Sequence, residues 1–188
     1  MGNAQAELHI DPVLQNKPIN GKVSLEQLNL TTFKAIFPQL QTLEGSVSAN
    51  GIINGSLGAP QYAGNIGISD LNVASDDLPI AINSGFVQAK ITGANADIDA
   101  GWQSGGSPVT LVGDANWKDV DSIIVNLLLD GEHIEVRHAP TVIAKVSPSV
   151  KLKMKGQEIA IRGRVEIPYA RVTIQELPLN ATQISKDV

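Results

Sequence analysis

The residues of this chain that are most versatile in chemistry are few and scattered. The histidines are His9, His133 and His138, and there is no cysteine. His138 lies five positions after His133, an odd offset, so an extended strand would point their side chains to opposite faces. Because a metal site needs two or three ligands that converge on one point, we expect exposed structural histidines and no bound metal. The lack of cysteine excludes a disulfide, a thiolate metal site and a cysteine nucleophile.

Two pairs of aspartates have a spacing that could serve acid–base chemistry. They are Asp97 with Asp99 and Asp119 with Asp121. Alternation along a strand would put each pair on one face about 7 Å apart, a separation that glycosidases use. The same spacing also arises from ordinary apolar–polar alternation, and the downstream glutamate of a calcium loop is missing. No nucleotide-binding, serine-nucleophile or zinc-protease motif occurs, so we expect no enzymatic activity and no cofactor.

The charge of the chain argues against a nucleic-acid partner. The formal net charge is −5 and the sequence pI is about 5.1, whereas a nucleic-acid surface needs clustered Lys and Arg. The one basic cluster is Lys151, Lys153 and Lys155, which alternate with Leu152 and Met154. This pattern predicts the solvated face of one strand. A contact with anionic lipid is the alternative interpretation.

The stretch Leu43–Leu57, L-E-G-S-V-S-A-N-G-I-I-N-G-S-L, shows the kind of element that carries these side chains. Its odd positions are apolar or small, and its even positions are polar except Ile52. A period of two predicts a long strand with one apolar face. Several glycines fall on that face, where they remove volume and ease bending of the backbone.

Similar alternation recurs along the chain and predicts about a dozen strands in a meander. A change of parity near Asp70 predicts a β-bulge. Asp130-Gly131 predicts a hairpin whose second arm carries Ile134 and Val136. Residues 123–129 have apolar residues at both parities, so this strand could be covered on both faces.

One short helix is expected at Thr31–Leu40, near the N-terminus. Phe33, Ile36, Phe37 and Leu40 have helical spacing, Thr31 or Thr32 could cap the start, and Pro38 would break or end the helix. We expect its apolar side to be buried on the apolar face of the sheet, as a plug or cap.

The block L-E-G-S-V-S-A-N-G-I-I-N-G-S-L-G-A-P-Q-Y-A-G-N-I-G-I resembles the recurring glycine-punctuated pattern of the TamB family, within the wider AsmA-like group. The late run I-R-G-R-V-E-I-P-Y-A-R-V-T-I-Q-E-L-P is similar to a segment of the C-terminal domain of that family. The likeness extends from about Leu43 to the end of the chain. It implies a long, curled antiparallel sheet that encloses an apolar groove, a shape called a β-taco.

The resemblance also implies a location and partners. It suggests a piece of a longer protein in the periplasm of a Gram-negative bacterium, anchored in the inner membrane by a segment outside residues 1–188. The expected partner is a TamA-like barrel of the outer membrane, with the contact outside this piece. The expected cargo is outer-membrane protein, including autotransporters, or phospholipid. The family offers no catalytic residue.

We therefore predict one all-β groove domain over residues 1–188 that acts as a non-enzymatic conduit. A closed β-sandwich that binds carbohydrate or protein is the alternative, because alternation alone does not distinguish an open sheet from a sandwich. The low aromatic share of 4% and the apolar phase of both tryptophans count against it. The predicted groove wall consists of Leu43, Val47, Ile53, Leu57, Ile66, Ile68, Leu71, Val73, Val87, Ile91, Ile98, Trp102, Val109, Leu111, Trp117, Ile123, Val125, Leu127, Ile134, Val136, Leu152, Ile159, Ile161, Val165, Ile167, Val172 and Ile174.

Overall fold

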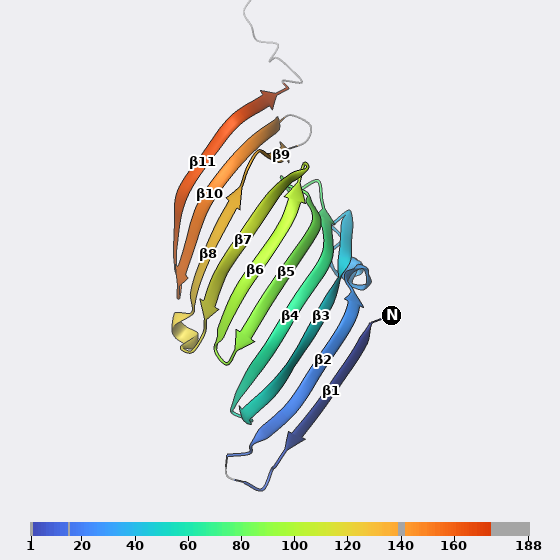
Figure 1. Cartoon of the computed structure of the whole chain (residues 1–188), viewed down its shortest axis with the longest axis vertical. Helices are drawn as coiled ribbons and strands as arrows, with labels where there is room; N and C mark the ends of the chain where they lie inside the picture. Colours follow the sequence, from blue (N-terminus) through green and yellow to red (C-terminus); the bar gives the residue numbers. More distant parts are fainter. Residues whose placement is uncertain (1, 15, 139–141, 174–188) are drawn as a thin grey trace, which may run out of the picture.

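A computed structural model describes residues 2–14, 16–138 and 142–173. The strands form one antiparallel sheet of 11 strands, in which all but β9 follow one another in chain order (Figure 1). The strands are β1 (Asn3–Ile10), β2 (Ile19–Asn29), β3 (Thr42–Ser56), β4 (Ala59–Ala74), β5 (Ile82–Thr92), β6 (Asn95–Ser104), β7 (Ser107–Asn116), β8 (Ile124–Gly131), β9 (Ile134–His138), β10 (Val142–Lys155) and β11 (Glu158–Val172). The predicted class, an all-β curled antiparallel sheet, is confirmed.

Strand register gives the sheet two faces of opposite character. One ladder of facing residues crosses the sheet from β1 to β11 and is apolar or glycine throughout: Ala4, Leu25, Ala49, Ile66, Ala89, Ile98, Gly113, Leu127, Leu152 and Ile161. The adjacent ladder is polar until its last member: Gln5, Ser24, Asn50, Asn65, Lys90, Asp97, Asp114, Asn126, Lys153 and Ala160. Since directly facing residues point to the same side of a sheet, we call the face of the first ladder the inner face and the other the outer face.

The sheet is a single open layer. The chain exposes 13627 Å² of surface, whereas a compact globular protein of this mass exposes about 8,700 Å². The buried apolar residues are few and mostly small or medium-sized: Ile19, Leu43, Ala96, Ala100, Val109, Ile134 and Ala144. The edge strands β1 and β11 are exposed along their whole length. This surface area does not fit a closed two-sheet sandwich.

Bulges interrupt the register of several strands toward one end of the sheet. The bulge predicted near Asp70 is present: the register with β5 shifts between Ile68 and Leu71, and Asp70 has a φ of 52°. Gln27 and Ser84 also have positive φ and lie at register shifts of β2 and β5. Because a bulge bends its strand and increases the local twist, these interruptions help the sheet to curl.

The hairpin predicted at Asp130-Gly131 is wrong. β8 and β9 both pair with β10, at Ser149–Lys155 and at Val142–Val146 respectively, so they run in the same direction as one interrupted strand. The interruption is at Glu132-His133, and His133 takes a φ of 53°. The long partner β10 thus keeps the chain extended where the local turn signal favours reversal.

The predicted helix is shorter than expected and starts earlier. Leu30–Ile36 forms a 3₁₀ helix, η1, and the side chain of Asn29, rather than Thr31 or Thr32, caps it by accepting a hydrogen bond from the Thr31 N–H. Ile36 and Phe37 remain 68% and 42% exposed, so the expected burial of the apolar side is wrong for these two residues. A second 3₁₀ turn, η2, spans Val120–Ser122. Among the described residues, no helix is both long and apolar enough to cross a bilayer.

Candidate functional site

The structure assembles most of the predicted wall residues on the inner face. Val47 faces Ile68, Val87 faces Ile68 from the other side, and the row continues across the sheet to Leu111. By register and alternation, the following predicted residues share that face: Leu43, Val47, Ile53, Ile66, Ile68, Leu71, Val73, Val87, Ile91, Ile98, Trp102, Val109, Leu111, Val125, Leu127, Ile134, Val136, Leu152, Ile159, Ile161, Val165, Ile167 and Val172.

Three of the predicted wall residues that the structure describes lie outside the strands. Leu57 lies in the turn between β3 and β4, where its N–H donates to the Lys17 carbonyl. Trp117 follows the end of β7, and Ile123 precedes β8. Ile174 lies outside the described residues. The register also resolves the ambiguity at residues 123–129, because Val125 and Leu127 face inner residues whereas Ile124 and Leu128 face outward.

The sequence reasoning missed several inner-face residues. They are apolar or aromatic and include Leu25, Tyr62, Leu129, Val150 and Met154. Tyr62 faces Ile53, and its hydroxyl donates to the Asn50 carbonyl at 3.0 Å. The alternation of neighbouring strands contained the signal for Val150 and Met154, which share the parity of Leu152.

Two facing glycines on β3 and β4 leave the inner face with little side-chain volume at that point. Gly51 faces Gly64 across β3 and β4, and the ring of Tyr62 occupies the space that a Cβ of Gly51 would need. A Cβ at Gly64 would lie 2.2 Å from the Asn50 carbonyl oxygen. These positions therefore require glycine because the backbone and an aromatic ring approach them closely.

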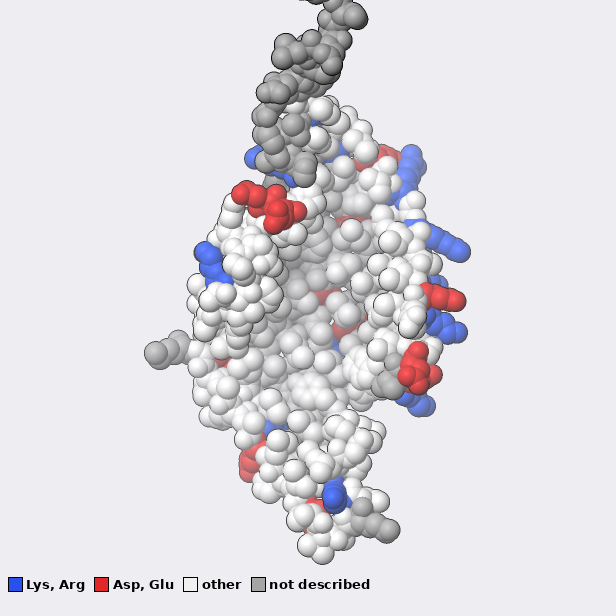
Figure 2. Space-filling view, turned by 180° about the vertical axis from the view of Figure 1, so that it is seen from behind, with Lys and Arg blue, Asp and Glu red and all other residues white. Residues whose placement is uncertain are grey.

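The hollow of the molecule lies on a broad face that is mainly uncharged (Figure 2). Many large apolar residues of the described sheet are open to solvent; on the edge strand, Ile159, Ile161, Val165 and Ile167 are 54–67% exposed. Monomeric proteins rarely leave a large contiguous apolar patch uncovered unless the patch binds something. The inner face is therefore the candidate binding surface.

One corner of the sheet is packed more closely than the rest. The loop at residues 75–81 crosses the tip of the β6–β7 hairpin, and its Pro79 carbonyl accepts a hydrogen bond from Arg137 N–H of β9 at 2.7 Å. Ser104 Oγ donates to the Glu135 carbonyl at 3.2 Å, and Val109 and Ile134 are 2% and 5% exposed. A cleft of about 480 Å³ remains between this loop and the Glu135–Arg137 ion pair.

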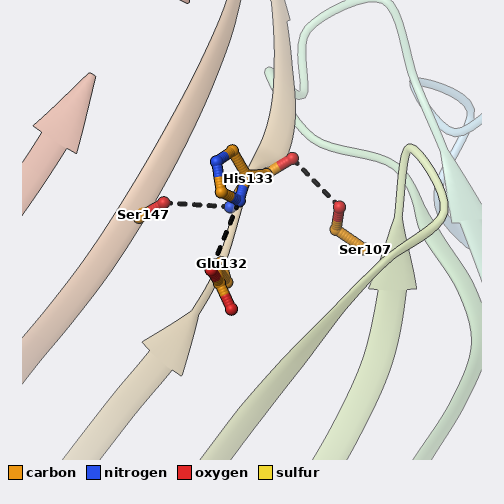
Figure 3. Close-up of polar contacts among 4 residues, drawn as sticks. All are labelled: Ser107, Glu132, His133 and Ser147. Atoms are coloured by element: carbon orange, nitrogen blue, oxygen red, sulfur yellow. Dashed lines mark hydrogen bonds and ion pairs between the residues drawn. The ribbon is translucent and has the colours of Figure 1, made fainter. Parts of the chain in front are cut away.

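The strand interruption at His133 is held from both sides (Figure 3). The His133 N–H donates to Ser147 Oγ at 3.0 Å, and the His133 carbonyl accepts from Ser107 Oγ at 3.0 Å. The imidazole Nδ1 lies 3.6 Å from a carboxylate oxygen of Glu132. These contacts fix the backbone of the kink, and the His133 side chain remains half exposed.

The residues considered for catalysis or metal binding are not brought together. His9 lies on the outer face of β1 with a 74% exposed side chain. Asp97 and Asp99 are exposed on the outer face of β6. The strand expected for Asp119 and Asp121 is wrong, since Asp119 caps η2 by accepting a hydrogen bond from the Asp121 N–H. No group of three or more metal-ligating side chains is found among the described residues.

Comparison with known proteins gives the family. The family model described as "TamB, N-terminal domain" matches residues 1–68, and the model described as "TamB C-terminal domain" matches residues 96–188. The likeness therefore extends beyond the predicted start at Leu43. A curated relative, "Translocation and assembly module subunit TamB" of Haemophilus influenzae, is 23% identical over 186 residues, which is 99% of this chain and 14% of the relative. No solved structure matches.

An open, curled β-sheet with one apolar face thus coincides with matches to two domains of the same family. The chain belongs to the TamB family. It spans about one seventh of the length of the curated relative.

Proposed function

We propose that the inner face is a binding surface for apolar cargo within a translocation and assembly module. The observation that carries this proposal is the uninterrupted apolar ladder from Ala4 to Ile161 on a single-layer sheet, none of whose members is fully buried. Burial of one large apolar side chain contributes about 1.5–3 kcal/mol. A few such contacts therefore give binding that is strong enough to hold cargo and weak enough to release it.

The cargo is an outer-membrane protein segment or the acyl chains of a phospholipid. An apolar wall is complementary to either one. An incoming β-strand could also pair with the open backbone of β1 or β11, whereas a lipid needs only the wall. The site is periplasmic in this proposal, in a protein anchored in the inner membrane and partnered by a TamA-like outer-membrane barrel. The name of the Haemophilus relative, a subunit of a translocation and assembly module, supports a place in such a module.

The role proposed is non-enzymatic. The histidine and aspartate side chains that could do chemistry are exposed and separated, as described above for His9, Asp97 and Asp99. The closed-sandwich binding module, the alternative from the sequence, is not favoured because the sheet exposes too much surface for a two-layer fold.

A charge on the inner face tests the proposal in the full-length protein. Leu111→Arg and Val125→Arg place a cation on the wall, and we expect loss of outer-membrane assembly or lipid transfer with the protein still folded and present at normal levels. The matched control is Thr110→Arg, since Thr110 is the preceding residue on β7, faces outward and is exposed.

Two results count against the open binding face. One is normal function of the inner-face variants. The other is unfolding of those variants, measured by circular dichroism and protease resistance, because a residue that fails only by destabilising the fold belongs to a core. Thr110→Arg is expected to retain both fold and function.

A further inference from the structure

The outer face of the sheet has a charge distribution that the inner-face proposal leaves unexplained. Strands β9, β10 and β11 carry eight basic and three acidic side chains, a net charge of +5, whereas the whole chain has a net charge of −5. Figure 2 shows Lys and Arg side chains projecting from one margin, away from the hollow. We define the basic strip as Lys151, Lys153, Lys155, Arg162 and Arg164, all exposed on the outer face of β10 and β11.

The arrangement within the strip leaves positive charge uncompensated. Lys151 directly faces Arg162, and Lys153 faces Ala160 on one side and Asn126 on the other. Like charges that face each other across strands are destabilising. Within the described part of the chain, Arg164 of the strip forms an ion pair with Glu166 at 2.9 Å, and Glu158 faces Lys155. Lys151, Lys153 and Arg162 therefore form a cationic centre without an acidic neighbour facing it.

An apolar patch borders this centre on the same face. Val112 faces Leu128, Leu128 faces Lys151, and Val112 and Ile124 are 42% and 38% exposed. The outer face thus offers a row of cations beside a short row of apolar side chains. A surface that presents phosphates above an apolar layer is complementary to both rows. Its phosphates would contact the cations, and its apolar layer would contact the apolar side chains.

We propose that the outer face of β10 and β11 docks on an anionic bilayer surface. Lysines spaced along an extended strand suit a surface of many mobile phosphates, because each ammonium group acts as a flexible point charge. The centre of a protein–protein interface is typically rich in aromatic residues and arginine and poor in lysine. Tyr169, which lies near Arg171 at the far end of β11, is the one aromatic residue within β10 and β11. The proposal does not depend on the nature of the cargo.

Vesicle flotation with the purified chain tests the docking surface. The variant Lys151→Gln, Lys153→Gln, Arg162→Gln removes the centre of the strip, and the control Lys22→Gln, Lys90→Gln, Lys118→Gln removes the same charge elsewhere. Each cation near an anionic surface raises affinity about fivefold. We therefore expect the strip variant to bind phosphatidylglycerol-containing vesicles about a hundredfold more weakly, while the control changes much less. Added salt should weaken binding of the unmodified chain.

Three outcomes would overturn the proposal. They are equal binding of the strip variant and the unmodified chain, equal binding to vesicles of pure phosphatidylcholine, and strip-dependent binding to soluble polyglutamate without binding to vesicles. The last outcome would assign the strip to an acidic protein partner. Circular dichroism of both triple variants checks that neither has lost the sheet. Vesicle binding depends here on the strip charges and on salt, whereas Leu111→Arg and Val125→Arg are assayed for outer-membrane assembly, so failure of this proposal is distinguishable from failure of the cargo proposal.

Discussion

At the scale of single residues, the inner face depends on where side chains are absent as much as on where they are present. Gly51 and Gly64 face each other, and the ring of Tyr62 lies over the space beside Gly51. The sequence predicted that glycines occupy the apolar face but not which of them tolerate a side chain. That distinction depends on distances to Asn50 and Tyr62, which come from strands that pair only in the folded sheet.

The glycine positions give a stability prediction. Gly64→Ala would bring a Cβ to 2.2 Å from the Asn50 carbonyl oxygen, so β3 and β4 must separate locally. We expect a loss of about 1–3 kcal/mol in the free energy of unfolding, measured by urea denaturation. The matched control is Gly67→Ala on the same strand, where the nearest atom is the Val87 carbonyl oxygen at 3.9 Å. Equal stability of the two variants would show that β3 and β4 do not approach as described.

At the scale of elements, alternation predicted strands well and turns less well. The period of two in Leu43–Leu57 predicted β3, and the change of parity at Asp70 predicted its bulge. The Asp130-Gly131 signal failed because a turn preference is local, whereas pairing of β8 and β9 with 14-residue β10 involves both ends of that strand. The prediction of the helix was wrong in part. Asn29 caps it one residue ahead of Leu30, so it starts earlier than expected, and the sheet does not bury Ile36.

The kink between β8 and β9 is testable by substitution at His133. Its φ of 53° lies in the left-handed region, where β-branched residues are strained by about 1–2 kcal/mol and asparagine is tolerated. We expect His133→Val to lower the free energy of unfolding by about that amount, while His133→Asn leaves it nearly unchanged. If valine were tolerated as well as asparagine, β8 and β9 would not be joined by the backbone seen in Figure 3.

At the scale of the whole molecule, the sequence alone left the open sheet and the closed sandwich unresolved. Each strand in either fold would show the same alternation, since one apolar face is enough for both. The difference is in what covers that face, and the exposed surface of 13627 Å² indicates that no described part of the chain covers most of it. That residues 1–188 behave as one domain stays a prediction, consistent with a ladder that continues through both family matches and the segment between them.

The central claim is that the inner face contacts cargo and the outer face does not. Photo-crosslinking in cells that express the full-length protein tests it most directly, with the crosslinker at inner positions Ile66 and Ile98 and at their outer neighbours Asn65 and Asp97, which lie away from the basic strip. The account predicts lipid or outer-membrane-protein adducts from the two inner positions and few from the outer pair. Equal adducts from both faces, or adducts from the outer pair alone, would contradict it.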